Sequence, residues 1–148
     1  MSYSFTGADI PAAASNFSVK PFQVVAPLAD PTYGLTITES LKELILNQSR
    51  LDLTTGTGDL QFEGTVTGYS VAPAAISSDE FAEINRLTIT LKVIYVNTLE
   101  EEKSFERTFS RFADYPTTQE LTNVEQTLIE EINDQLTQDI FDASLGSW

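Results

Sequence analysis

The run of residues 86–97 constrains the fold more than any other part of the chain, because its side chains alternate strictly between two sets. One set is entirely apolar: Leu87, Ile89, Leu91, Val93 and Tyr95. The other set begins with Arg86 and includes Lys92, six residues further along. Successive side chains of a strand point to opposite faces, so this pattern predicts a β-strand with one face in a core and the other face outside it.

Two further runs alternate with the same period and are expected to complete an antiparallel meander. The first starts at Asp59 and is interrupted by Gly64 and Gly68, which is typical of a bulge or a close backbone contact. Tyr69 is assigned to the outer face of this strand. The residues assigned to its core face are Leu60, Phe62 and Val66. The second run covers residues 103–112 and follows the central strand closely enough to form a hairpin.

Two segments repeat apolar residues with the spacing of an amphipathic helix. The first is predicted to begin at Thr36 and to end near residue 50, since Thr36 and Glu39 have the spacing of a capping box. The second is predicted to begin at Thr122 and to end near residue 145, with Glu125 completing the same motif. Each helix has a single apolar stripe, so each is expected to bury one side only.

The order of the predicted elements defines the fold class. A short alternating segment at residues 17–20 ends before Pro21 and supplies a fourth strand. We therefore predict an α/β chain of the α+β kind, a two-layer sandwich in which a four-stranded mixed sheet carries two helices packed on one face. A length of 148 residues suits one domain over residues 1–148, with residues 1–15 as an extended N-terminal arm.

Composition excludes several classes of function. The chain has no His and no Cys, so the usual zinc ligands, proton shuttle and thiol chemistry are missing, and we expect neither an enzyme nor a cofactor. The net charge of −14 repels nucleic-acid phosphates, so nucleic-acid binding is not expected. No apolar run approaches the roughly 20 residues of a membrane-spanning helix.

Three groups of residues invite a functional interpretation. The carboxylates around Glu130 and Asp134 are compatible with an acid-base pair, although a solvated helix face explains them more simply. In residues 103–111 cations alternate with aromatic rings, which suits an acidic ligand or, as we favour, core rings flanked by long cationic side chains. The connection at residues 71–81 is long and poor in charge, which is equally compatible with contact to a partner and with packing over its own sheet.

Several short motifs follow one another from residue 3 to the C-terminus. They are Tyr3-Ser4-Phe5-Thr6-Gly7, Gly58-Asp59-Leu60-Gln61-Phe62-Glu63-Gly64 with Thr67-Gly68-Tyr69, Asn85-Arg86-Leu87-Thr88-Ile89-Thr90, Phe109-Ser110-Arg111-Phe112, and Glu130-Glu131-Ile132 through Asp139-Ile140-Phe141 to Trp148. In this order and spacing the chain resembles the lipopolysaccharide-assembly lipoprotein family, LptE, in its Bacteroidetes-type branch. The resemblance covers nearly the whole chain and depends on the order of the motifs.

The resemblance implies a non-enzymatic lipoprotein on the periplasmic side of the outer membrane, anchored by lipid on a Cys just upstream of Tyr3. Such a protein sits inside an LptD-like β-barrel, assists the assembly of that barrel and helps deliver lipopolysaccharide to the outer leaflet. On this basis Pro73 and Ile76 are candidates for barrel contact, and Arg86 and Lys92 for lipopolysaccharide phosphates. A periplasmic lipid-binding module, a structural lipoprotein without a barrel partner, and a hydrolase with two converging carboxylates are the alternatives.

Overall fold

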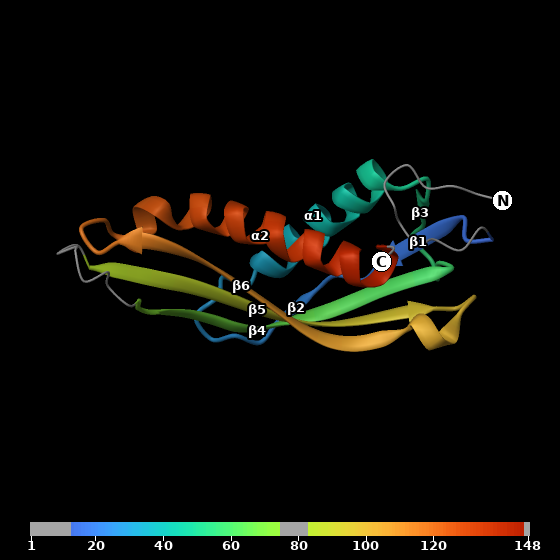
Figure 1. The fold of residues 1–148 in the computed structure, drawn as a ribbon, viewed down its shortest axis with the longest axis horizontal. Coiled ribbons are helices and arrows are strands. Elements are labelled where there is room, and N and C mark those ends of the chain that lie inside the picture. The colour runs from blue at the N-terminus through green and yellow to red at the C-terminus, as the bar shows by residue number, and fades with distance from the viewer. Residues whose placement is uncertain (1–12, 75–82, 147–148) are drawn as a thin grey trace.

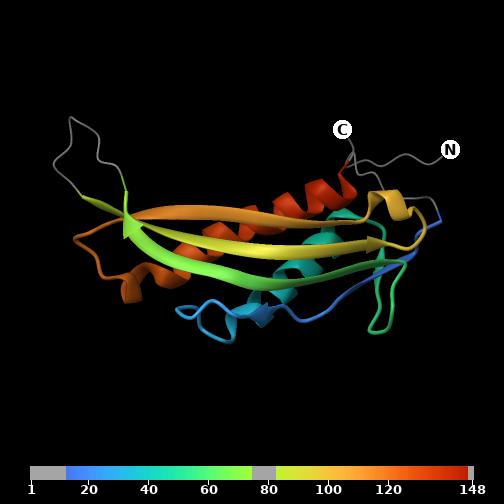
Figure 2. The same cartoon turned by 90° about the horizontal axis from the view of Figure 1, so that it is seen from below.

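A computed structural model describes residues 13–74 and 83–146, and Figure 1 shows a long sheet with two helices lying across one of its faces. The helices are α1 (Tyr33–Gln48) and α2 (Leu121–Leu145). Seen from below in Figure 2, the sheet lies in front of both helices. The expected class, an α+β two-layer fold with both helices on one face, is confirmed.

Among the described residues the sheet has six strands, so the prediction of four is wrong. They are β1 (Asn16–Val19), β2 (Gln23–Val24), β3 (Asp52–Leu53), β4 (Leu60–Pro73), β5 (Ile84–Asn97) and β6 (Phe105–Pro116). The predicted antiparallel meander is β4-β5-β6, with a 3-10 turn (Glu101–Lys103) between β5 and β6. β1 runs parallel to β3 and β4, and β2 runs parallel to β4. β2 and β3 have two residues each, too few to display a period of two.

A bulge in β4 changes which face its second half presents. Val66 pairs with Leu91 and Gly68 with Thr90, so one residue of β4 has no counterpart on β5 and the side chains beyond it change faces. Tyr69 is consequently buried on the helix side, and its assignment to the outer face is wrong. Gly68 suits this position because a Cβ there would lie 3.1 Å from the side chain of Thr90.

The core lies between the inner face of the sheet and the two helices. Every apolar residue predicted for the inner face of β5 is at most 1% exposed. Both helices contribute residues of zero exposure to the same core: Ile37, Leu41, Ile45, Ile132, Leu136 and Ile140. The amphipathic stripes predicted from the sequence are therefore the buried stripes of the structure.

Both helices begin without the capping boxes expected from the sequence. α1 starts at Tyr33, three residues before the predicted position, and α2 starts at Leu121, and neither N-cap residue makes a side-chain capping hydrogen bond. The glutamates of the two motifs have other partners, because Glu39 pairs with Lys42 at 3.0 Å and Glu125 accepts a hydrogen bond from the Tyr69 hydroxyl. Glu125 thus has a tertiary contact in place of a cap, whereas Glu39 has another local contact within α1.

α1 approaches the chain between β1 and β2 most closely at Gly34. A Cβ at this position would lie 2.2 Å from the carbonyl oxygen of Phe22. The buried Thr38 hydroxyl joins the two segments, since it accepts a hydrogen bond from the Phe22 amide at 2.8 Å and donates one to the Gly34 carbonyl at 2.6 Å. Any side chain at residue 34 would force the helix away from the sheet.

Candidate functional site

Arg86 lies on the outer face of β5, as predicted, but its charge is already engaged. Its Nε and Nη2 donate to the two carboxylate oxygens of Asp114 on β6, at 2.8 and 3.2 Å. Its guanidinium also stacks over the Phe112 ring, 3.8 Å from the ring centroid. The hydrogen bond to Asp114 raises the pKa of Arg86 above its usual value. A phosphate approaching Arg86 would compete with a carboxylate that already holds it in two-point geometry.

Lys92 also lies on the outer face, at the rim of a shallow depression of about 200 Å³. The depression forms where Pro21 interrupts the edge of the sheet between β1 and β2, and Phe22 turns its ring to the inner face beneath Gly64. Lys20, which follows β1 directly, also lines it, so two Lys residues border the depression together with one acidic residue, Glu63. The Lys92 ammonium is 3.4 Å from Glu106, and half of its side chain is exposed.

The sequence predicts two pairs of candidates, Pro73 with Ile76 and Arg86 with Lys92, and the structure describes three of these four residues. Arg86 and Lys92 share a face, but six residues of extended strand separate them by about 20 Å. Pro73 is exposed at the end of β4, opposite Asn85, where the β4-β5 hairpin approaches its tip. Ile76 lies outside the described residues. Arg86 pairs with Ala72 and so lies at the same end of the sheet as Pro73, whereas Lys92, opposite Thr65, lies apart from both.

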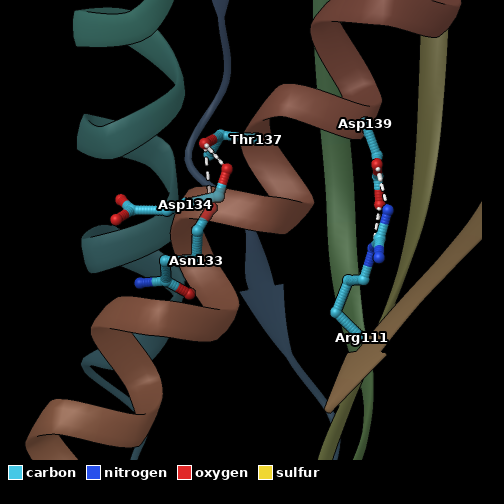
Figure 3. Close-up of polar contacts among 5 residues, drawn as sticks. All are labelled: Arg111, Asn133, Asp134, Thr137 and Asp139. Carbon is cyan, nitrogen blue, oxygen red and sulfur yellow. Dashed lines mark hydrogen bonds and ion pairs between the residues drawn. The ribbon is translucent and has the colours of Figure 1, made fainter. Parts of the chain in front are cut away.

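One of the cations of β6, Arg111, joins the sheet to α2. Phe109 is buried and Phe105 packs against the core, while Arg111 donates two hydrogen bonds to Asp139 of α2 at 2.7 and 2.9 Å. Figure 3 shows Arg111 reaching from the strand to Asp139 on the helix. Arg107 lies over the Phe105 ring, 4.7 Å from its centroid. The favoured interpretation of residues 103–111, core rings flanked by cationic side chains, therefore agrees with the structure.

A groove of about 430 Å³ lies between the N-terminal halves of α1 and α2. Its carboxylates come from the loop before α1 and from α2: Asp30, Glu125, Glu130 and Asp134. Hydroxyl and amide groups form most of the remaining surface: Thr32, Tyr33, Thr36, Ser40, Tyr69, Thr122, Gln126 and Asn133. Of the described residues that line this helix groove, none is Lys or Arg.

Two tyrosines form the floor of the helix groove and join its walls. The Tyr33 hydroxyl of α1 donates to Oδ1 of Asn133 on α2, and the Tyr69 hydroxyl of β4 donates to Glu125. Burial raises the pKa of Tyr33, and burial together with the hydrogen bond to Glu125 raises that of Tyr69. Both hydroxyls are therefore neutral donors at physiological pH. The carboxylate of Asp30 accepts two hydrogen bonds from Thr32, which lower its pKa and keep it ionised.

The acidic side chains of the described segments are not arranged as a metal site. Within residues 13–74 and 83–146 no three carboxylates lie close enough together to hold a metal ion. In the same part of the chain, no helix combines the length and the apolar character needed to cross a membrane.

Sequence reasoning missed Lys20 and the helix groove. Lys20 was counted only as part of an edge strand, although Pro21 marked the interruption that forms the depression beside it. Tyr69 and Glu125 had been assigned to the outer face and to a capping box, so nothing brought them together. The signal that could have placed Tyr69 was Gly68, which marks the bulge.

Comparisons with known proteins agree with this architecture. The family model LptE, described as lipopolysaccharide-assembly, matches residues 15–144. No curated protein matches the sequence. Among solved structures, a protein of Xanthomonas campestris has a TM-score of 0.59 at 12% identity, covering 90% of this chain and 86% of its own. A hypothetical protein of Chlamydia trachomatis has a TM-score of 0.56 at 7% identity, covering 89% and 98%.

A third solved structure, the uncharacterized lipoprotein B of Nitrosomonas europaea, has a TM-score of 0.55 at 14% identity, covering 95% of this chain and 88% of its own. Because the sequence identities are so low, these similarities show a shared fold and nothing more. The family match spans both helices and the whole meander, so it covers the depression and the helix groove as well.

Proposed function

The chain belongs to the lipopolysaccharide-assembly family LptE, and from this premise we propose that it is an outer-membrane lipoprotein subunit of the lipopolysaccharide translocon, in the Bacteroidetes-type branch. The observation that carries the proposal is the family match over residues 15–144. The family is one of non-enzymatic lipoproteins, so the chain acts by binding. The proposal includes a lipid anchor on the periplasmic side of the membrane, attached to a Cys of the native gene just upstream of the Tyr3 segment; this chain has Met1 and Ser2 before Tyr3 and no Cys.

The proposed partner is an LptD-like β-barrel, which this subunit plugs and helps to assemble. The layered fold supports this role, because both helices cover one face of the sheet and leave its other face uncovered by helices (Figure 2). Pro73 is exposed next to the β4-β5 tip, and it remains our candidate for barrel contact together with Ile76. Both residues lie in or beside the longest connection of low charge.

For lipopolysaccharide phosphates, we favour Lys92 over Arg86 and add Lys20 as a candidate. Lys20 and Lys92 both line the outer-face depression, and the Lys92 ammonium lies 3.4 Å from Glu106, whereas Asp114 holds Arg86 through two hydrogen bonds. A phosphate seated there would accept charge-assisted hydrogen bonds from both lysines. The net charge of −14 makes long-range attraction to an anionic glycolipid weak, so contact with the barrel is the primary role and lipid contact is local.

The alternatives make different demands on the fold. A periplasmic lipid-binding module needs an apolar groove, and the groove between the helices is lined by carboxylates and hydroxyls. A hydrolase needs two carboxylates converging on a substrate, and among the described residues no feature beyond the solvated acids of the helix groove supports one. A structural lipoprotein without a barrel partner would have the same fold, so a purification experiment is needed to distinguish this alternative from our proposal.

The direct experiment is native purification of a tagged full-length lipoprotein from its own membranes. We expect an LptD-like barrel to co-purify in a stoichiometric complex. A lipoprotein that purifies alone under mild detergent contradicts the translocon role and supports a structural lipoprotein.

Lipid contact is tested separately by measuring lipopolysaccharide binding to the soluble domain. The double substitution Lys20→Gln and Lys92→Gln should weaken binding roughly tenfold, which corresponds to about 1.4 kcal/mol. The control is Lys42→Gln with Lys103→Gln, which removes the same charge elsewhere. Equal losses in both variants would show that only net charge matters.

A further inference from the structure

The two sides of the sheet end in different ways. On one side of β4 the sheet ends in the short strands β1, β2 and β3, with Pro21 between β1 and β2. On the other side it ends in β6, which pairs with β5 from Phe105 to Pro116 without a bulge. Short edge strands, prolines and bulges are the usual means by which a protein keeps its edges from pairing with another chain. β6 has none of these before its last residue.

The pairing of β6 with β5 determines which backbone groups face the open edge. The Thr117 amide donates to the Glu83 carbonyl at 3.0 Å, and hydrogen-bonded pairs of this kind recur at every second residue of an antiparallel ladder. The odd-numbered residues of β6 therefore bond to β5. The even-numbered residues from Glu106 to Asp114 turn their N–H and C=O groups to the edge, and no described strand lies beyond them. Such a row of groups is a template for a further strand.

Charge does not protect this edge, because three of its four charged side chains form ion pairs within the chain. On the outer face, Glu106 and Asp114 are paired with cations of β5. On the inner face, Arg111 is paired with Asp139 of α2. Phe112, on the same strand, is a large apolar side chain that is 47% exposed. The edge thus offers a strand partner backbone groups and an exposed ring beside charges that are already compensated.

The helix layer leaves part of this edge open. The ion pair of Arg111 with Asp139 marks the point where α2 crosses β6, and Figure 2 shows that the crossing is oblique. The C-terminal half of α2 reaches past the edge on one side of this point, and the N-terminal half lies behind the inner strands on the other side. A strand can therefore approach residues 112–116 of β6 without meeting α2.

A second copy of the chain fits this edge in one antiparallel register. Residues directly opposite each other lie on the same face, so the two-fold axis between two copies of β6 passes beside a residue. An axis at residue 109, 110 or 111 opposes Arg107 to Arg111, Glu106 to Asp114, or Arg111 to itself, and like charges directly opposite each other are destabilising. An axis at residue 112 opposes no like charges, and axes closer to either end pair fewer residues.

We propose that β6 pairs antiparallel with β6 of a second copy, about a two-fold axis at Phe112, so that two sheets join into one with the helices of both copies on the same face. Residues 108–116 of the two copies then pair, Ser110 lies opposite Asp114, and the two Phe112 rings bury apolar surface against each other. The net charge of −14 opposes association, so the dimer should strengthen as salt rises. This inference goes beyond the proposed function and does not depend on it.

Sedimentation equilibrium of the purified chain tests the dimer. We expect a reversible equilibrium between monomer and dimer, with a Kd below about 1 mM in about 0.15 M salt and a lower Kd in about 0.5 M salt. A chain that stays monomeric at about 1 mM overturns the proposal. A dimer that weakens as salt rises is held by ion pairs, which also contradicts it.

The register is tested with single cysteines, because the chain has no Cys of its own. Phe112→Cys places two thiols directly opposite each other, where the Cα atoms of a hydrogen-bonded pair lie about 5.5 Å apart, within the range of a disulfide. Thr108→Cys on the same face is the matched control, since the two copies of residue 108 lie roughly 27 Å apart in this register. Mild oxidation should give a covalent dimer of the first variant and little of the second. Equal yields, or a higher yield at residue 108, contradict the proposal.

A proline tests whether the backbone of the edge makes the contact. Ser110→Pro removes an N–H that faces the edge and not β5, a position at which edge strands tolerate proline, and it should weaken dimerisation at least about tenfold. Ser110→Ala keeps the N–H and should leave the Kd of the dimer nearly unchanged. Circular dichroism should show the same helix and strand content in both variants. If the two variants dimerise equally well, the backbone of β6 does not form the contact and the proposal is overturned.

Discussion

On the face of β5 that meets the helices, the side chains from Leu87 to Tyr95 are at most 1% exposed, whereas Arg86 and Lys92 on the opposite face are 40% and 48% exposed. The same backbone thus carries two surfaces with different tasks. The inner surface holds the layers together, and the outer surface remains available to ligands. Substitutions on the inner face should therefore change stability, while those on the outer face should change binding.

The largest expected effect is on the inner face. Ile132→Ala removes a side chain of zero exposure from α2 and should lower the free energy of unfolding by about 2–5 kcal/mol. On the outer face, the exposed Thr108→Ala should change it by no more than about 0.5 kcal/mol. Urea unfolding of both variants measures the contrast. Similar losses in the two variants would contradict the division between the faces.

The contact between α1 and the β1-β2 segment is tested by a pair of glycines. Gly34→Ala places a Cβ against the Phe22 carbonyl and should cost about 1–3 kcal/mol, because backbone must move to accommodate it. Gly56→Ala is the control, since a Cβ there meets nothing within 4 Å. Thermal unfolding should separate the two variants. A fully stable Gly34→Ala protein would show that the helix does not approach so closely.

Alkaline pH should weaken the interior below the helix groove. Burial raises the pKa of Tyr33 above its ordinary value of about 10, so the unfolded chain releases this proton first. The stabilisation is therefore complete below about pH 10 and is lost as pH rises toward the folded pKa, by up to about 1.4 kcal/mol per pH unit. In Tyr33→Phe the free energy of unfolding should fall less steeply above about pH 10. If the free energy of unfolding depends on pH equally steeply in Tyr33→Phe and in the unsubstituted protein, Tyr33 is not the cause of the loss.

The smallest effect concerns the ion pair between the layers. Arg111 and Asp139 are well aligned but partly exposed, so a double-mutant cycle with alanine should give a coupling of about 0.2–1 kcal/mol that shrinks in salt. The outer-face pair of Arg86 and Asp114 serves as the comparison and should behave alike. A coupling well above this range would mean that the pair is a main connection between the layers.

Much of the fold is predictable from the sequence because it depends on periodicity. The period of two in residues 86–97 identified the central strand and both of its faces, and the helical stripes identified the helix layer. β2 and β3 were missed because a strand of two residues is too short to show an alternation of apolar and polar side chains. Tyr69 was placed on the wrong face because the bulge in β4 inverts the alternation of side chains beyond it. Counting residues along a strand cannot show where such a bulge lies.

The candidate site was less predictable because it depends on register between distant segments. Parity placed Arg86 and Lys92 on the outer face, and the structure confirms this. Whether each cation has a partner depends on the β5-β6 register, which aligns Arg86 with Asp114. The proximity of Lys20 to Lys92 follows from the parallel pairing of β1 and β2 with β4, which no local pattern encodes.

The most direct test of the translocon role is site-specific photocrosslinking in cells that carry the full-length lipoprotein. A photoreactive residue at Pro73, beside the β4-β5 tip, should capture an LptD-like barrel, and the same residue at Ile76 should do so too. A photoreactive residue at Glu43, exposed on α1, serves as the control. The account predicts strong capture from positions 73 and 76 and little from 43; equal capture from all three, or capture from 43 alone, contradicts it.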